Sequence, residues 1–150
     1  MKRIYKTGLV IVAIVWLGCL FNSCSKGANP EGSTPVPYVK VNVSININSS
    51  PYTGLQTIGG VAYATGGNRG IVLYRSNATT ITAFDRTCTY DLPDNGGIVQ
   101  AENNGTAVCI DCGSTYGLSN GNVLSGPSTL GLQLYNTSFN STTGNLTITN

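Results

Sequence analysis

From residue 38 onward, the sequence alternates hydrophobic and polar positions in the way that a half-buried β-strand does. Branched aliphatic side chains at every second position from Val39 to Ile47 are interleaved with lysine, asparagine and serine. Successive side chains of a strand point to opposite faces, so this alternation predicts a strand with one buried face. Shorter β-rich runs follow at 60–64, 71–75, 81–85, 97–101, 107–110, 123–124, 130–135 and 146–148.

Turn sequences separate these runs. Gly-Gly-Asn at 66–68, Pro-Asp-Asn-Gly at 93–96 and Asn-Asn-Gly at 103–105 all favour tight turns. The sequence after residue 38 has no window of sustained helical period and no internal repeat. It therefore predicts one all-β domain over residues 38–150, built from nine or ten short antiparallel strands.

The first 37 residues follow a different pattern. Three basic residues among the first six precede an apolar run from Leu9 to Phe21. As a helix these thirteen residues would span about 20 Å, which is less than the ~30 Å hydrocarbon core of a bilayer. The run therefore predicts a signal peptide over residues 1–23. Residues 24–37 are rich in Pro, Gly and Ser, which predicts a flexible linker.

The end of the apolar segment resembles the lipobox of bacterial lipoproteins of the Bacteroidetes type. In such proteins a signal peptidase cuts before a cysteine that then carries lipid, and here Ser23 supplies the small residue before Cys24. The resemblance implies lipidation at Cys24, a membrane as partner, and a domain on the periplasmic or outer surface of the cell envelope. Cleavage at Cys19 and an uncleaved anchor without lipid are the alternatives. Each places the domain in a compartment that permits disulfides.

Charge and composition narrow the range of functions. From Cys24 onward the chain has five basic and six acidic residues, which gives a net charge of −1. A near-neutral domain lacks the basic surface that nucleic-acid binding requires. The chain also contains no histidine, which excludes Ser–His and Cys–His catalysis within it and removes the commonest metal ligand. We therefore expect no enzyme, and at most an electron-transfer component.

Three of the five cysteines fall in the β domain. Cys88 follows the run at 81–85, whereas Cys109 and Cys112 flank the end of the run at 107–110. Metal sites and disulfides in β domains are both built from loops that leave strand ends and carry sulfur. We therefore expect the two loops to meet at one tip of the domain.

The order of residues around these cysteines resembles the Rieske iron–sulfur domain. Cys-Thr-Tyr at 88–90 and Cys-Ile-Asp-Cys at 109–112 stand where that family has Cys-x-His and Cys-x-x-His. Eighteen residues separate the two motifs, close to the family spacing, and the resemblance covers most of residues 60–150. Further matches are Gly-Ser-Thr-Tyr at 113–116, Gly-Asn-Val at 121–123 and Gly-Pro at 126–127.

The resemblance implies a Rieske-like stack of antiparallel sheets with a two-loop cluster-binding tip, covered by the loop at Gly126 and Pro127. It implies that Ser114 and Tyr116 hydrogen-bond to cluster or cysteine sulfurs. We also expect Gly113 and Gly121 in tight loop backbone that a larger residue would strain.

The metal ligands depart from the family pattern. In a Rieske [2Fe–2S] centre two cysteines hold one iron and two histidines hold the other. Cys88 and Cys109 match the cysteine ligands, whereas Tyr90 and Cys112 stand at the histidine positions. One possibility is a low-potential cluster with Cys112 and either Tyr90 or Asp111 on the second iron.

Two other chemistries stay open. Without a metal, the shared iron site of the family implies a Cys88–Cys109 disulfide, with a Cys109–Cys112 bridge as the alternative. The third possibility is a soft metal such as Zn²⁺. If a cluster is present, the function is that of a lipid-anchored electron-transfer domain with a redox partner protein. If no metal is bound, it is that of a binding or structural module stapled by a disulfide.

Overall fold

The structure is a computed structural model that describes residues 36–90, 92 and 97–150. The predicted signal peptide, Cys24 and nearly all of the predicted linker lie outside the described residues. Within the described part of the chain, none of the helices has the length and apolar character needed to cross a membrane.

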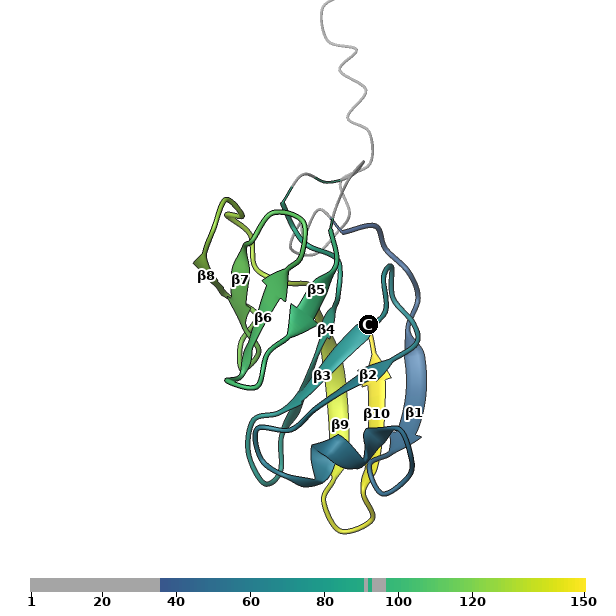
Figure 1. The fold of residues 1–150 in the computed structure, drawn as a ribbon. Helices are drawn as coiled ribbons and strands as arrows, with labels where there is room; N and C mark the ends of the chain where they lie inside the picture. Colours follow the sequence, from purple (N-terminus) through teal and green to yellow (C-terminus); the bar gives the residue numbers. More distant parts are fainter. Residues whose placement is uncertain (1–35, 91, 93–96) are drawn as a thin grey trace, which may run out of the picture. The chain divides into compact units, whose positions relative to one another are not determined.

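Ten antiparallel strands make up two sheets in the described residues, which confirms the predicted all-β class (Figure 1). The larger sheet has the order β1-β10-β9-β4-β3-β2 and curls into half a barrel, and the smaller has the order β5-β6-β7-β8. The strands are β1 Asn42–Asn46, β2 Val61–Ala64, β3 Ile71–Arg75, β4 Ile81–Asp85, β5 Val99–Ala101, β6 Thr106–Cys109, β7 Thr115–Gly117, β8 Val123–Ser125, β9 Leu134–Asn140 and β10 Asn145–Thr149.

The alternation in the sequence sets the register of the first and last strands. Val43 in β1 pairs with Ile148 in β10, and Ile45 pairs with Leu146. The polar residues between them, such as Ser44, lie on the exposed face. A slip of one residue would move the whole apolar set into solvent, so the pattern specifies this pairing.

Strands β3 and β4 are buried on both faces and separate two hydrophobic cores. Ile71 and Leu73 point into the core inside the larger sheet, whereas Val72 points into the core beneath the smaller sheet. The second core contains Val72, Phe84, Cys88, Val99, Ala107, Cys109, Tyr116, Leu118 and Leu132. Two of the three cysteines in the domain are therefore core residues.

The structure differs from the predicted elements in three places. A short 3₁₀ helix, η1, spans Tyr52–Gln56, and strand β7 was not expected from the sequence. The predicted strand at 130–135 begins and ends later, as β9. Both β7 and the second half of β9 are rich in small or polar residues that show no hydrophobic period, so they form strands through pairing with their neighbours.

Gly113 and Gly121 have similar backbone conformations but different surroundings, so a comparison of the two tests the packing around Gly121. Both adopt the expected left-handed backbone, with φ of +73° and +76°. A Cβ atom at Gly121 would lie 2.5 Å from Cε1 of buried Phe84, whereas one at Gly113 would meet no atom within 4 Å.

We therefore expect Gly113→Ala to lower the free energy of unfolding by about 1 kcal/mol, from backbone strain alone. Gly121→Ala should lower it by about a further 1–3 kcal/mol, because Phe84 must move. Urea denaturation of both variants measures the difference, and equal losses would contradict the packing described for Phe84.

Candidate metal centre

The three cysteines of the domain form one cluster. Cys88 lies beyond the end of β4, Cys109 is the last residue of β6, and Cys112 lies in the turn that leads to β7. Their Sγ atoms all lie within 4.8 Å of one another, as free thiols. Cys88 and Cys109 are buried, and Cys112 is partly exposed. The expected meeting of the two cysteine-bearing loops is therefore confirmed.

Backbone hydrogen bonds hold the Cys88 loop against the smaller sheet. The backbone N–H of Cys88 donates to the carbonyl of Gly97 at 2.7 Å. One residue earlier, Thr87 forms an isolated antiparallel bridge with Ile98. The chain that leaves the larger sheet at β4 is thereby tied to the segment that enters β5.

A tight turn carries the other two cysteines. The N–H of Cys109 donates to the carbonyl of Ser114 at 2.8 Å, and the N–H of Gly113 donates to the carbonyl of Cys109 at 3.0 Å. This turn folds Cys112 back towards Cys88, and the two Sγ atoms are 3.6 Å apart.

The loop at 126–128 packs against the same turn. Ser114 Oγ lies 3.2 Å from Cys112 Sγ and accepts a hydrogen bond from the N–H of Ser128 at 3.0 Å. A Cβ atom at Gly126 would lie 2.4 Å from Cα of Ser114, so the two backbones are in close contact. Pro127 is exposed. Ser114 thus contacts the thiol of Cys112 and Gly126 packs against Ser114, whereas Pro127 belongs to the outer surface of this loop.

A network of hydrogen bonds between buried hydroxyl groups begins at the thiol of Cys88. Tyr116 Oη lies 3.2 Å from Cys88 Sγ and 3.2 Å from Thr89 Oγ1. Thr89 Oγ1 is in turn 2.8 Å from Ser128 Oγ and donates to the carbonyl of Leu130. The sequence indicated Tyr116 and placed Ser128 in the covering loop. It gave neither Thr89 nor Ser128 a hydrogen-bonding role, because serine and threonine are too frequent in this chain for any pattern to single them out.

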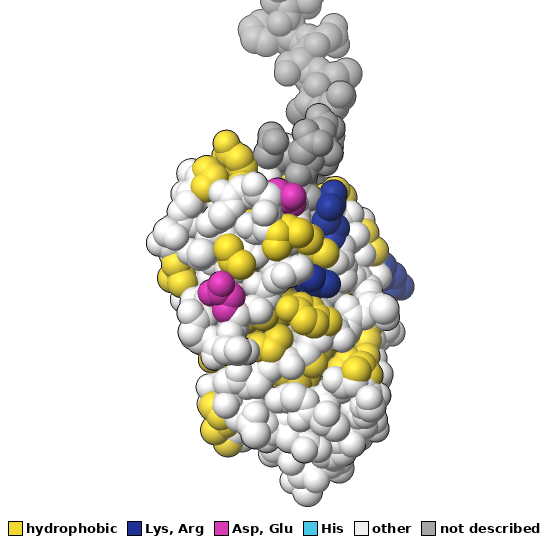
Figure 2. Space-filling view, in the orientation of Figure 1, with side chains coloured by type: hydrophobic (Ala, Val, Ile, Leu, Met, Phe, Trp, Pro, Cys, Tyr) yellow, Lys and Arg dark blue, Asp and Glu magenta, His cyan; other side chains and the backbone are white. Residues whose placement is uncertain are grey.

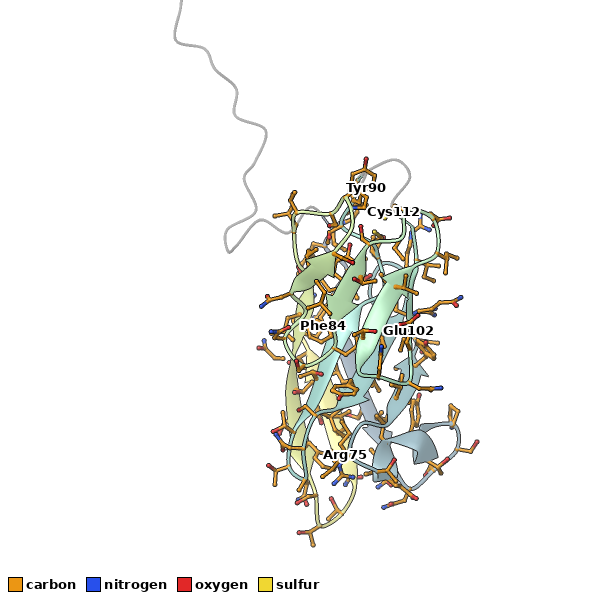
Figure 3. The ribbon with its side chains drawn as sticks, turned by 60° about the vertical axis from the view of Figure 1, so that its left-hand side comes forward. Arg75, Phe84, Tyr90, Glu102 and Cys112 are labelled. Carbon is orange, nitrogen blue, oxygen red and sulfur yellow. The ribbon has the colours of Figure 1, made fainter. Side chains whose placement is uncertain are left out.

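Tyr90 contributes its backbone rather than its ring to the cysteine cluster. Its N–H donates to Cys88, and its side chain is 43% exposed. Figure 3 shows Tyr90 at the same end of the domain as Cys112, with its hydroxyl directed outward. Asp111 is also exposed. Within the described residues, the group of cysteine and acidic ligands that converges on one point consists of the three thiols.

The thiols of Cys88 and Cys112, 3.6 Å apart, differ in acidity. Burial raises the pKa of the Cys88 thiol to about 12, although hydrogen bonds with Tyr116 and the Tyr90 backbone act in the opposite direction. Partial burial also raises the pKa of Cys112, but hydrogen bonds with Ser114, Cys109 and Cys88 outweigh it and bring the pKa below its ordinary value. Negative charge is therefore easier to develop on Cys112 than on Cys88.

No protein-family model and no curated protein matches the chain.

The geometry of the thiols suits one thiophilic ion. Two sulfurs at about 2.3 Å from a tetrahedral Zn²⁺ lie about 3.8 Å apart, close to the 3.6 Å between Cys88 and Cys112. A [2Fe–2S] cluster needs four protein ligands over two irons, but the described residues bring only three thiols to this point. The three thiols alone do not complete this ligand set, and the [2Fe–2S] cluster stays a prediction.

A disulfide at this site requires one pair of sulfurs to move closer together. The S–S bond length is about 2.05 Å, so Cys88 and Cys112 would have to approach by about 1.5 Å. The Cys88–Cys109 disulfide stays a prediction, and Cys88–Cys112 is now a third possible pair.

The raised pKa of Cys88 predicts how stability depends on pH. Above pH 9 the unfolded chain loses the thiol proton while the folded chain keeps it up to about pH 12. The reduced, metal-free protein should therefore lose up to about 1.4 kcal/mol of unfolding free energy per pH unit in this range. Urea denaturation at pH 8, 9 and 10 measures this slope. Cys88→Ser should flatten it, and an unchanged slope in that variant would assign the effect to other groups.

Proposed function

We propose that residues 38–150 form a Rieske-like domain of the cell envelope whose tip binds a single thiophilic ion through three thiols. The observation that carries this proposal is the convergence of Cys88, Cys109 and Cys112 within 4.8 Å. Thiolates select soft ions, two of these three thiols are buried, and the thiols of Cys88 and Cys112 are hydrogen-bonded to hydroxyl groups.

The arrangement of the tip supports the Rieske-like relation. The four strands of the smaller sheet carry the Cys109 turn, and the Cys88 loop is bonded to the segment entering that sheet. A third loop, through Gly126, covers the Ser114 turn. These are the features that the sequence resemblance implies. The ligand set differs, since Cys112 supplies sulfur where the family has an imidazole.

The surface chemistry of the face in Figure 2 agrees with a protein that does not bind nucleic acid. The face shown in Figure 2 carries a few separate charged side chains and no continuous basic patch. We propose that the lipid on Cys24 is the contact with the membrane. A disulfide-stapled binding module is the second candidate function, because Cys88 and Cys112 lie only 3.6 Å apart.

Titration with Cd²⁺ tests the thiolate site. The full chain, reduced and kept anaerobic in detergent, should bind one Cd²⁺ with a sulfur-to-metal absorption band in the ultraviolet, and its Tm should rise. Cys112→Ser should weaken the binding by about tenfold or more, whereas Ser125→Ala, on the exposed edge strand β8, should leave it unchanged.

Two results would contradict the proposed site. Stoichiometric iron and labile sulfide, together with visible absorption, would instead support an iron–sulfur cluster and a function in electron transfer. Chain that retains no ion and carries a disulfide between two of the three cysteines, even after purification under reducing conditions, would support the stapled module instead.

Lipidation is tested separately by metabolic labelling. Labelled palmitate should enter the wild-type protein and be absent from Cys24→Ser, because the cysteine that follows the signal peptide is the acceptor. Label that persists in Cys24→Ser and disappears in Cys19→Ser would move the lipidation site to Cys19.

A further inference from the structure

We propose that the tip is built to bind trivalent arsenic, held by Cys88, Cys109 and Cys112 as a neutral tris-thiolate. This inference rests on the proposed thiolate site and names the ligand of that site. Three observations lead to it: the number of ligands, the absence of charge compensation, and the position of the one accessible thiol.

The ligand number matches three-coordinate arsenic. The chain has no histidine, and among the described residues no fourth cysteine or carboxylate lies within 4.8 Å of all three sulfurs. The exposed carboxylate of Asp111 lies near Cys109 Sγ, outside this group. A structural zinc site needs four protein ligands. Trivalent arsenic forms three bonds to sulfur, and its lone pair occupies the fourth position. Three thiols therefore complete its coordination without help from another residue.

The charge of the site favours a trivalent centre. With three thiolates, Cu⁺ leaves a net charge of −2, Zn²⁺ leaves −1, and As(III) leaves none. Cys88 and Cys109 are packed in the second core, where an uncompensated charge is costly. A neutral complex avoids this cost.

The surrounding side chains provide no positive charge. No lysine or arginine in the described residues makes a hydrogen bond or ion pair with the three sulfurs, and their side-chain partners besides one another are the hydroxyls of Tyr116 and Ser114. Arg86, close to Cys88 in the sequence, directs its guanidinium to the carbonyl of Val99 and the ring of Tyr63. Neutral hydroxyl groups suit a neutral complex.

Binding needs neither an oxidant nor a reductant. Arsenous acid, As(OH)₃, would reach Cys112 first, because this thiol is partly exposed while the other two are buried. Three As–O bonds and three S–H bonds break, three As–S bonds form, and each thiol proton leaves with a hydroxide as water. Arsenic stays in the +3 state throughout. A lipid-anchored domain that carries out this exchange would retain arsenite at the envelope.

The test uses the full chain, reduced and anaerobic in detergent, titrated with sodium arsenite. One equivalent of arsenite should make three thiols unreactive in a thiol titration. A variant in which Cys88, Cys109 and Cys112 are all changed to Ser gives the number of thiols that Cys19 and Cys24 contribute. X-ray absorption should show three sulfur neighbours around arsenic. Each single Cys→Ser variant should lose about tenfold or more in affinity, equivalent to about 1.4 kcal/mol, and Ser125→Ala should bind as wild type.

The outcomes separate this inference from the proposed function. If Cd²⁺ binds and arsenite does not, the arsenic inference is wrong while the thiolate site stands. Arsenite bound through only two thiols, with one single Cys→Ser variant unaffected, also overturns the tris-thiolate. If neither ion binds to a chain that keeps its β circular dichroism and three reactive thiols, both proposals fail.

Discussion

The buried carboxylate of Asp85 fixes the chain at the point where it leaves the larger sheet and enters the Cys88 loop. It lies at the end of β4 with no exposed surface, and it accepts hydrogen bonds from the N–H groups of Asn68 at 2.6 Å and Thr87 at 2.8 Å and from the hydroxyl of Tyr135 at 2.7 Å. A buried carboxylate is tolerated only when its oxygens are hydrogen-bonded. These donors therefore have to gather at one point, and Cys88, next to Thr87, is positioned with them.

The second core then determines how firmly the thiols are held. Cys88 and Cys109 are packed with Phe84 and Tyr116 between the two sheets, so their side chains have little freedom to rearrange. Cys112 lies in a turn, but Ser114 holds it on one side through a hydrogen bond. Metal sites supported by packing and by hydrogen bonds from neighbouring groups bind more tightly than sites on free loops.

The chemistry of the tip follows from its three sulfur donors. Three thiols around one point, with hydroxyl groups as their side-chain hydrogen-bond partners, make a site that is soft and small, and a buried excess of negative charge would destabilise it. The same proximity lets two of the thiols approach bonding distance when no ion is present. Ion binding and disulfide formation are therefore competing outcomes at one site, and the redox state of the compartment influences which one prevails.

The sequence by itself determined the β class, the alternation that pairs the first and last strands, and the placement of sulfur on two loops. These features are local: a period of two residues, a turn sequence or a left-handed glycine such as Gly121 is readable from adjacent positions. Tertiary structure alone decided that Cys112 is the thiol 3.6 Å from Cys88, that Thr89 and Ser128 are buried beneath the site, and that the ring of Tyr90 is turned outward. Such distances join residues up to 39 positions apart, and they depend on how loops pack over the second core, which no local pattern encodes.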